Sequence, residues 1–266
     1  MYEGKISQKE INKLAYETLN NSFKSSIDKF FYPKLNKSYC EKNIEYIGLE
    51  NLDEALKAGK GVVLLHGHLG NPHLIMPAIG FKGYKLHQLA SRNPPEKLSG
   101  VFSAFVNSIR YKIYELDTSL KEKLPVNFIY IDLFLRSPFE CLKRNEIIAI
   151  GMDGREGAKS VEVPFLKHRA IFYTGSMRLI MQTKPIVLPT FHIRERNNKH
   201  KIIIEKPLEI EISGNREKDI YNNINKFVII LEEYVYKYPG LYAEAFCLKE
   251  HFLLQMKEEL DRVSDG

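Results

Sequence analysis

An apolar run that leads straight into a histidine-bearing turn constrains this chain more than any other feature. Val62 to Leu65 has β-branched and leucine character without polar alternation, which is typical of a strand buried on both faces of a parallel sheet. Asn71 follows as a candidate helix cap, and Pro72 suits a first helical turn, where a missing N–H costs nothing. We therefore predict that His68 lies between the carboxyl end of a strand and the start of a helix.

That position suits acid–base chemistry. An imidazole works as a general base near neutral pH, and the N–H groups at a helix start hold an anion or a developing oxyanion. A second strong strand, Glu146 to Met152, runs directly into Asp153-Gly154. Ligands bind at the carboxyl ends of parallel strands, so we expect the turns that carry His68, Arg92 and Asp153 to converge on one cleft.

The remaining pattern alternates strands with helices. We predict helices over 51–59, 95–110 and 174–183 and another that ends near Arg144, strands over 84–89, 112–116, 161–165 and 186–193, and a hairpin through Asn197-Asn198 to Ile204. The segment 120–138 is the least regular. This alternation predicts an α/β protein over residues 1–266, a single domain with a mostly parallel central sheet covered by helices.

The first 35 residues are expected to form an amphipathic helix. Ser7 and Glu10 make a capping box, apolar residues recur at helical spacing from Ile11 to Phe30, and Pro33 stops the run. Such a helix either packs on the domain core or lies on a membrane surface, and its amphipathic pattern alone does not separate these alternatives.

Composition indicates the class of binding partner and the cellular compartment that suit this chain. A formal net charge of +6 favours anionic partners such as phospholipid surfaces, although a solvated basic surface explains it equally well. The cysteines, Cys40, Cys141 and Cys247, form no CxxC pair, which argues for a reducing compartment and against structural zinc. No apolar run approaches the roughly 20 residues of a spanning helix. We expect a cytoplasmic protein, peripheral on the inner face of the cell membrane.

Several blocks, in order, resemble the late acyltransferases of lipid A, a branch of the lysophospholipid acyltransferase superfamily. Gly67-His68-Leu69-Gly70-Asn71 is similar to the catalytic block, and Ser91-Arg92-Asn93-Pro94 with Arg110 is similar to the second. Asn145-Glu146 through Asp153-Gly154 is similar to the third, and Val163-Pro164-Phe165 and Tyr238 to Tyr242 fall where the family has comparable motifs. The resemblance covers about residues 40–250 and its block order is its most specific feature.

The resemblance implies an O-acyltransferase of lipid biosynthesis. In that reaction His68 takes a proton from a hydroxyl of a glycolipid or lysophospholipid-like acceptor as it attacks an acyl thioester of coenzyme A or acyl carrier protein. The thioester is a substrate, and no cofactor is expected. Arg92 would bind phosphate or the acceptor and Arg110 would bind phosphate, and the amides around Gly70 and Asn71 would support the oxyanion or an anionic group.

The chain departs from the family at one position. Five residues after the histidine the family has an acidic residue that orients it, whereas this chain has His73. Neutral His73 accepts a hydrogen bond but supplies no negative charge, and protonated His73 opposes formation of the imidazolium. Asp153 is the leading replacement, and further acidic candidates are Glu115, Asp117 and Glu156. Otherwise the His68–His73 pair works at reduced efficiency, or the fold only binds lipid or acyl carrier.

The residues around the first predicted strand also fit a different functional class. His66 and His68 after a strand, with His73 as a third ligand, would suit a metal-dependent hydrolase. No motif indicates nucleic-acid or dinucleotide binding. Arg155 and Lys167 are interpreted as an exposed basic loop. Core or surface roles are the default for the remaining histidines, with His87, His168 and His192 in or beside strands and His200 and His251 on the surface.

Overall fold

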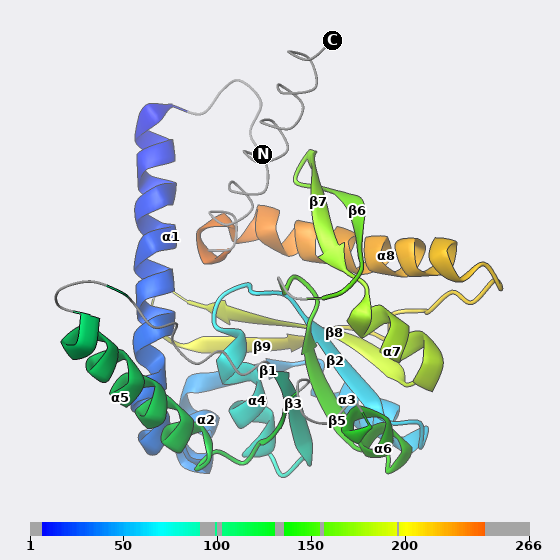
Figure 1. Ribbon diagram of the computed structural model, residues 1–266, viewed down its shortest axis with the longest axis horizontal. Helices are drawn as coiled ribbons and strands as arrows, with labels where there is room; N and C mark the ends of the chain where they lie inside the picture. The colour runs from blue at the N-terminus through cyan, green and yellow to red at the C-terminus, as the bar shows by residue number, and fades with distance from the viewer. Residues whose placement is uncertain are drawn as a thin grey trace.

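The computed structural model describes residues 7–90, 99, 103–130, 136–154, 157–195 and 197–242. Within them a seven-stranded sheet has the order β1-β9-β8-β2-β5-β3-β4 (Figure 1). Its strands are β1 (Ile44–Ile47), β2 (Val62–His66), β3 (Leu86–Ala90), β4 (Asn127–Tyr130), β5 (Ile147–Gly151), β8 (Ile186–Arg194) and β9 (His200–Ile204). Only the β8–β9 pair is antiparallel among the neighbouring strands of this sheet. The predicted α/β class with a mostly parallel sheet is confirmed.

Helices cover both faces of this sheet. They are α1 (Gln8–Asp28), η1 (Lys29–Lys34), α2 (Lys37–Asn43), α3 (Leu49–Lys57), α4 (Pro72–Gly80), α5 (Ser103–Lys121), α6 (Ser137–Lys143), α7 (Gly175–Thr183), α8 (Arg216–Lys237) and η2 (Pro239–Leu241). A separate hairpin joins β6 (Ser160–Phe165) to β7 (His168–Tyr173).

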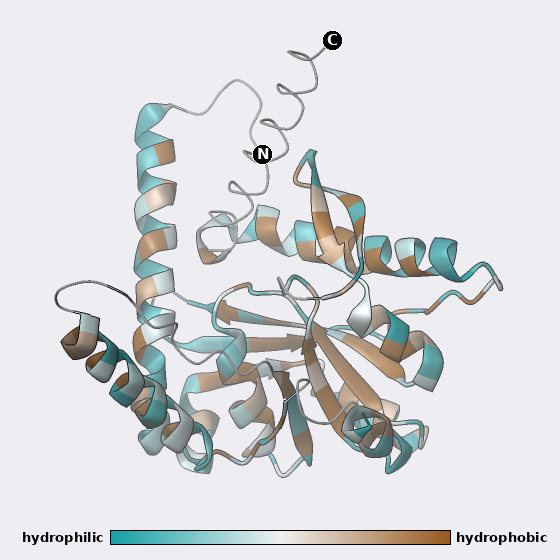
Figure 2. Ribbon diagram, viewed as in Figure 1, coloured by the Kyte–Doolittle hydropathy of each residue, from teal (hydrophilic) through white to brown (hydrophobic). Residues whose placement is uncertain are grey.

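Strand β2 shows how the two layers form. Its residues are all buried, as its unbroken apolar run predicts. Val63 and Leu65 pack with α6, α7 and α8, whereas Val62 and Leu64 pack with α3, α4 and the end of α5. Because successive side chains of a strand point to opposite faces, one continuous apolar run supplies both cores. Figure 2 shows this apolar centre in the brown central strands.

The N-terminal helix begins as predicted but leaves much of its apolar stripe exposed. The capping box of Ser7 and Glu10 is present, and the α-helix ends at Asp28, after which the 3₁₀ helix η1 runs through Pro33. Thr18 is its only buried residue within the described part of the chain, while Leu19 and Phe23 are exposed. Packing on the core therefore accounts for only part of the apolar periodicity of α1.

Several predicted elements are wrong. The expected strand over 112–116 belongs to α5, because Ile109, Ile113, Leu116 and Leu120 recur at helical spacing along a single face. The segment 120–138, read as irregular, contains β4 and the start of α6. The helix α3 begins at Leu49, and Asn51 does not cap it, since its side-chain amide donates to the Ile204 carbonyl at 2.8 Å. Strands β1 and β7 and helices α2 and α8 were not predicted.

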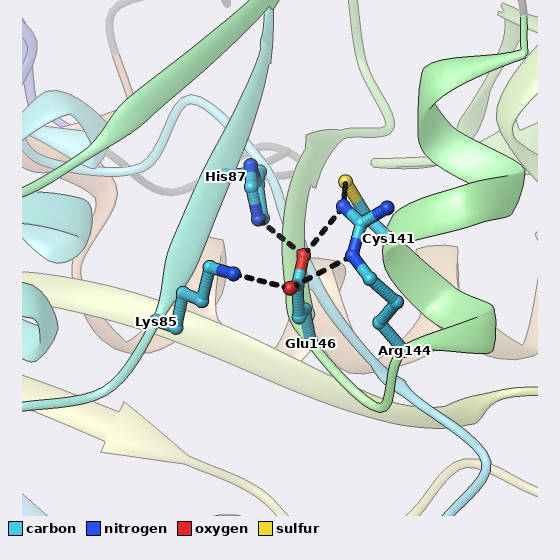
Figure 3. A network of polar contacts seen from close by, with 5 residues as sticks. All are labelled: Lys85, His87, Cys141, Arg144 and Glu146. Atoms are coloured by element: carbon cyan, nitrogen blue, oxygen red, sulfur yellow. Dashed lines mark hydrogen bonds and ion pairs between the residues drawn. The ribbon is translucent and has the colours of Figure 1, made fainter.

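The buried carboxylate of Glu146 links three elements at the amino end of the sheet (Figure 3). Glu146, 6% exposed, accepts hydrogen bonds from Lys85 at 2.5 Å, from His87 at 2.8 Å and from Arg144 at 3.0 Å. Hydrogen bonding to Arg144 is the main reason why the pKa of Glu146 falls to about 2. Arg144 also contacts the Cys141 sulfur at 3.4 Å. The network joins β3, α6 and β5 at the end of the sheet opposite His68.

Candidate active site

The pairing of β2 with β5 brings His68 and Asp153 together. The two strands are parallel, with His66 opposite Gly151. His68 and Asp153 each follow two residues after these partners, so their turns leave the sheet side by side at its carboxyl edge. This is the edge where ligands bind in open α/β sheets.

His68 and Asp153 form a doubly bonded pair. The His68 Nδ1 lies 2.7 Å from Oδ1 of Asp153, and the backbone N–H of His68 donates to Oδ2 at 2.8 Å. Burial opposes ionisation of Asp153, but the charge and the hydrogen bonds of His68 outweigh it, so the pKa of Asp153 is lowered. An ionised Asp153 requires a proton on Nδ1 of His68, which leaves Nε2 as the basic nitrogen.

Tyr242 completes the setting of this carboxylate. Its hydroxyl, on a side chain 1% exposed, donates to Oδ2 of Asp153 at 3.1 Å. A Cβ on Gly67 would lie 2.8 Å from the Leu231 side chain and 3.2 Å from Oδ2 of Asp153, so a larger residue would push into the pair. Sequence reasoning placed Tyr242 in a family motif without giving it a role.

A cavity of about 310 Å³ opens over His68. The turn after β2 and the start of α4 form its floor, and α1, η1 and α5 form its walls. Its lining comprises Ser22, Ser25, Ser26, Lys29, Tyr32, His68, Gly70, Asn71, Pro72, His73, Asp117 and Lys121. The imidazole of His68 thus faces a space lined by both hydroxyl and ammonium groups, with Asp153 buried behind it.

A family model of bacterial lipid A biosynthesis acyltransferases matches residues 4–243. The chain belongs to this family. No curated protein matches the chain. Membership identifies the protein as an acyltransferase-family member of lipid biosynthesis, and it implies acyl transfer onto a lipid acceptor.

His73 lines the cavity of this acyltransferase-family protein without holding the imidazole of His68. The Nδ1 of His68 bonds to Asp153 and not to His73. Although the His73 ring opens onto the cavity, the surrounding protein reduces its hydration, and together with Lys121 and His68 this lowers its pKa. A lowered pKa disfavours a positive charge on His73, which would oppose an imidazolium at His68.

The amides of Gly70 and Asn71 are not available for an oxyanion. The Gly70 N–H donates to the Leu241 carbonyl, and the Asn71 N–H donates to Nδ1 of His192, both at 2.8 Å. The expectation that these two amides support the oxyanion is therefore wrong. Asn71 precedes α4 as predicted, but its side chain donates to Asp28 at 2.7 Å and does not cap the helix.

The other acidic candidates lie elsewhere. Asp117 faces the cavity but pairs with Lys121 at 2.6 Å and with Lys29 at 3.9 Å. Glu115 is exposed on α5. Arg110 lies on α5 two turns before Asp117 and is not among the residues that line the cavity. Lys167 is in the β6–β7 turn. Outside the described residues lie Arg92, Arg155, Glu156, Cys247 and His251.

The alternative of a metal centre formed by His66, His68 and His73 after β2 finds no support in the described residues. His66 is buried, its Nδ1 is 3.4 Å from the Gly67 carbonyl oxygen, and burial lowers its pKa to about 4. Within the described residues, the group with metal-ligand spacing is His87, Cys141 and Glu146. Arg144 and Lys85 already occupy that carboxylate, as Figure 3 shows, so the cluster is an ion-pair network.

Two further histidines are buried behind the turn that carries His68. His192 is fully buried and His200 is 5% exposed, so the interpretation of His200 as a surface residue is wrong. The Nε2 of His192 lies 2.9 Å from Nδ1 of His200. No sequence signal separates this pair from ordinary core residues, because they meet only through the antiparallel pairing of β8 with β9.

Proposed function

We propose that this acyltransferase is an O-acyltransferase of the late lipid A branch, which moves a fatty acyl group from coenzyme A or acyl carrier protein to a hydroxyl of a glycolipid or lysophospholipid-like acceptor. The observation that carries the proposal is the His68–Asp153 pair at the floor of the cavity. It provides an imidazole whose Nδ1 is held by a carboxylate, with that buried carboxylate behind the ring.

The reaction then proceeds by general-base catalysis. Nε2 of His68 takes the proton of the acceptor hydroxyl as its oxygen attacks the thioester carbonyl. Asp153 stabilises the resulting imidazolium. The tetrahedral intermediate collapses to the ester, the C–S bond breaks, and the departing thiolate takes the proton from His68. No covalent acyl-enzyme and no cofactor take part.

The cationic groups of the site suit an anionic substrate. Lys29 and Lys121 face the cavity, and Asp117 neutralises only part of their charge. Arg110 lies on the same helix as Lys121, three turns closer to its N-terminus. We assign Arg110 and Arg92 to the phosphate of the donor or acceptor, because a planar guanidinium binds two phosphate oxygens at once.

Two helices offer a surface for a membrane that contains such lipids. We define the α1–α5 surface by its exposed apolar side chains, which are Ile11, Tyr16, Leu19, Phe23, Phe30, Phe31, Phe105, Val106, Ile109, Ile113 and Leu116. Both helices line the cavity, and Figure 2 shows apolar residues on both at the left of the molecule. None of the helices in the described part of the chain is long and apolar enough to cross a bilayer.

We propose that the α1–α5 surface lies on an anionic bilayer, on the cytoplasmic side. Exposed lysines, among them Lys13, Lys34 and Lys37, flank its apolar residues, and this combination is typical of interfacial helices. Phe23→Glu is expected to weaken sedimentation with anionic vesicles at least tenfold. The matched control is Ile229→Glu, an exposed apolar residue on α8, outside the α1–α5 surface. Equal binding of both variants would refute this orientation.

A transfer assay tests the proposed reaction. Wild-type protein is incubated with radiolabelled acyl-CoA or acyl carrier protein and a bacterial lipid extract, and thiol release is followed in parallel with ester formation. We expect label in an alkali-sensitive lipid ester. Thiol release with free fatty acid alone would indicate a hydrolase. Binding of the donor without thiol release would indicate a homologue that has lost catalysis.

A further inference from the structure

The turn that carries His68 is held from behind as well as by Asp153. Gly70 has a φ of +67°, and a Cβ there would lie 2.4 Å from the His192 carbonyl oxygen and 2.5 Å from its Nδ1. Only glycine tolerates both the backbone conformation and this approach. The turn therefore packs directly against β8 at His192. The proposed acyl-transfer mechanism gives His192 no role.

The hydrogen bonds around His192 define its protonation. Its Nδ1 accepts from the Asn71 N–H at 2.8 Å, so this nitrogen carries no proton. The proton is on Nε2, which donates to Nδ1 of His200 at 2.9 Å. Each ring is thus neutral and has one possible tautomer, which fixes the direction of every hydrogen bond in the chain from Asn71 to His200.

The end of α1 holds the same turn from the other side. Asp28 accepts a hydrogen bond from the Asn71 side chain at 2.7 Å and pairs with Arg194, whose side chain is 6% exposed. Ser25 also contacts the Gly70 carbonyl at 3.4 Å. Asn71 therefore joins the catalytic turn to both β8 and α1.

We infer that His192 is a positioning residue of the acyltransferase, which acts through the hydrogen bond from the Asn71 amide to its Nδ1. This inference rests on the proposed function. His68 is three residues from Asn71, so a turn released at Asn71 lets the imidazole move away from Asp153. Small displacements are costly, since about 1 Å of misplacement lowers catalysis roughly a hundredfold.

Two nearly isosteric variants separate this role from packing. In His192→Asn the side-chain oxygen replaces Nδ1 and still accepts from the Asn71 amide, although the link to His200 is lost. In His192→Gln the terminal amide reaches toward His200, and the acceptor at the Nδ1 position is lost. We expect His192→Asn to keep kcat within about threefold of wild type and His192→Gln to lower kcat at least tenfold with little change in KM.

Thermal melting of both variants provides the stability control. Equal losses of kcat in the two variants, or losses that follow only the folded fraction, would overturn the inference. A readout independent of activity comes from ¹⁵N NMR of histidine-labelled wild-type protein, with His192 assigned by its absence in His192→Asn. We expect the Nε2–H tautomer between pH 6 and pH 8. The Nδ1–H tautomer or a charged ring would contradict the inference even if acyl transfer is confirmed.

Discussion

Replacing Asp153 with asparagine would change the tautomer of His68 without removing a side chain. In the wild type one carboxylate oxygen accepts from Nδ1 of His68, and the other accepts from the His68 backbone N–H and from Tyr242. An asparagine has one accepting oxygen and one donating NH₂ group. The backbone N–H cannot reverse its role, whereas an imidazole is able to change tautomer. The oxygen therefore faces the backbone, and the NH₂ group faces Nδ1.

His68 must then accept at Nδ1 and carry its proton on Nε2, where the acceptor hydroxyl needs a base. The same substitution in a serine protease triad lowers kcat roughly 10⁴-fold, and a fall of about 10³- to 10⁴-fold is expected here. A 10⁴-fold fall corresponds to about 5 kcal/mol in the activation free energy.

The measurement is kcat for transfer from the labelled thioester, with circular dichroism and thermal melting as checks of folding. Asp53→Asn is the matched control, because it makes the same chemical change on α3, where Asp53 accepts a hydrogen bond from the Tyr84 hydroxyl far from the cavity. A folded Asp153→Asn protein with kcat within threefold of wild type would refute the reasoning.

Three other substitutions give further tests. His73→Glu should not raise kcat more than about twofold, because Asp153 already supplies the orienting charge; a tenfold rise in the transfer assay would show that Asp153 does not act in this way. Tyr242→Phe removes one hydrogen-bond donor to Asp153 and should lower kcat about threefold to tenfold. An unchanged kcat would show that the Tyr242 hydroxyl has no role in the reaction. Glu146→Gln should lower the free energy of unfolding by about 2 kcal/mol at pH 7, measured by urea denaturation. The pKa of Glu146 in the folded protein is depressed to about 2, so the carboxylate contributes its full stabilisation above about pH 4.5 and loses it as the pH falls toward 2. The unfolding free energies of wild type and variant should therefore converge in acid. A difference that stays constant with pH would contradict this linkage.

The sequence predicted the parts of the site that depend on strands. The apolar runs at Val62 and Ile147 identified buried parallel strands, and polar residues that directly follow such strands must gather at one sheet edge. This reasoning singled out both His68 and Asp153. It ranked Asp153 first among the replacements for the missing acid only by its place after a strand, and the strand register shows why the two side chains meet.

The parts that depend on packing between distant segments were not predictable. His192 and His200 are ordinary strand residues in the sequence, and they meet behind the turn through strand pairing. The role of the Gly70 and Asn71 amides was misjudged for the same reason, because their partners come from β8 and η2. The apolar periodicity of α1 predicted a helix correctly, but periodicity does not indicate what packs against the apolar face of that helix.

The central claim is that His68 is the base for acyl transfer, and the rate of ester formation by His68→Ala tests it most directly. The control is Lys57→Ala, an exposed residue on α3 that pairs with Glu54. General-base catalysis contributes roughly 10²- to 10⁴-fold, so we predict that His68→Ala loses at least a hundredfold in kcat while Lys57→Ala keeps wild-type activity. Transfer by a folded His68→Ala protein at the wild-type rate would contradict the account.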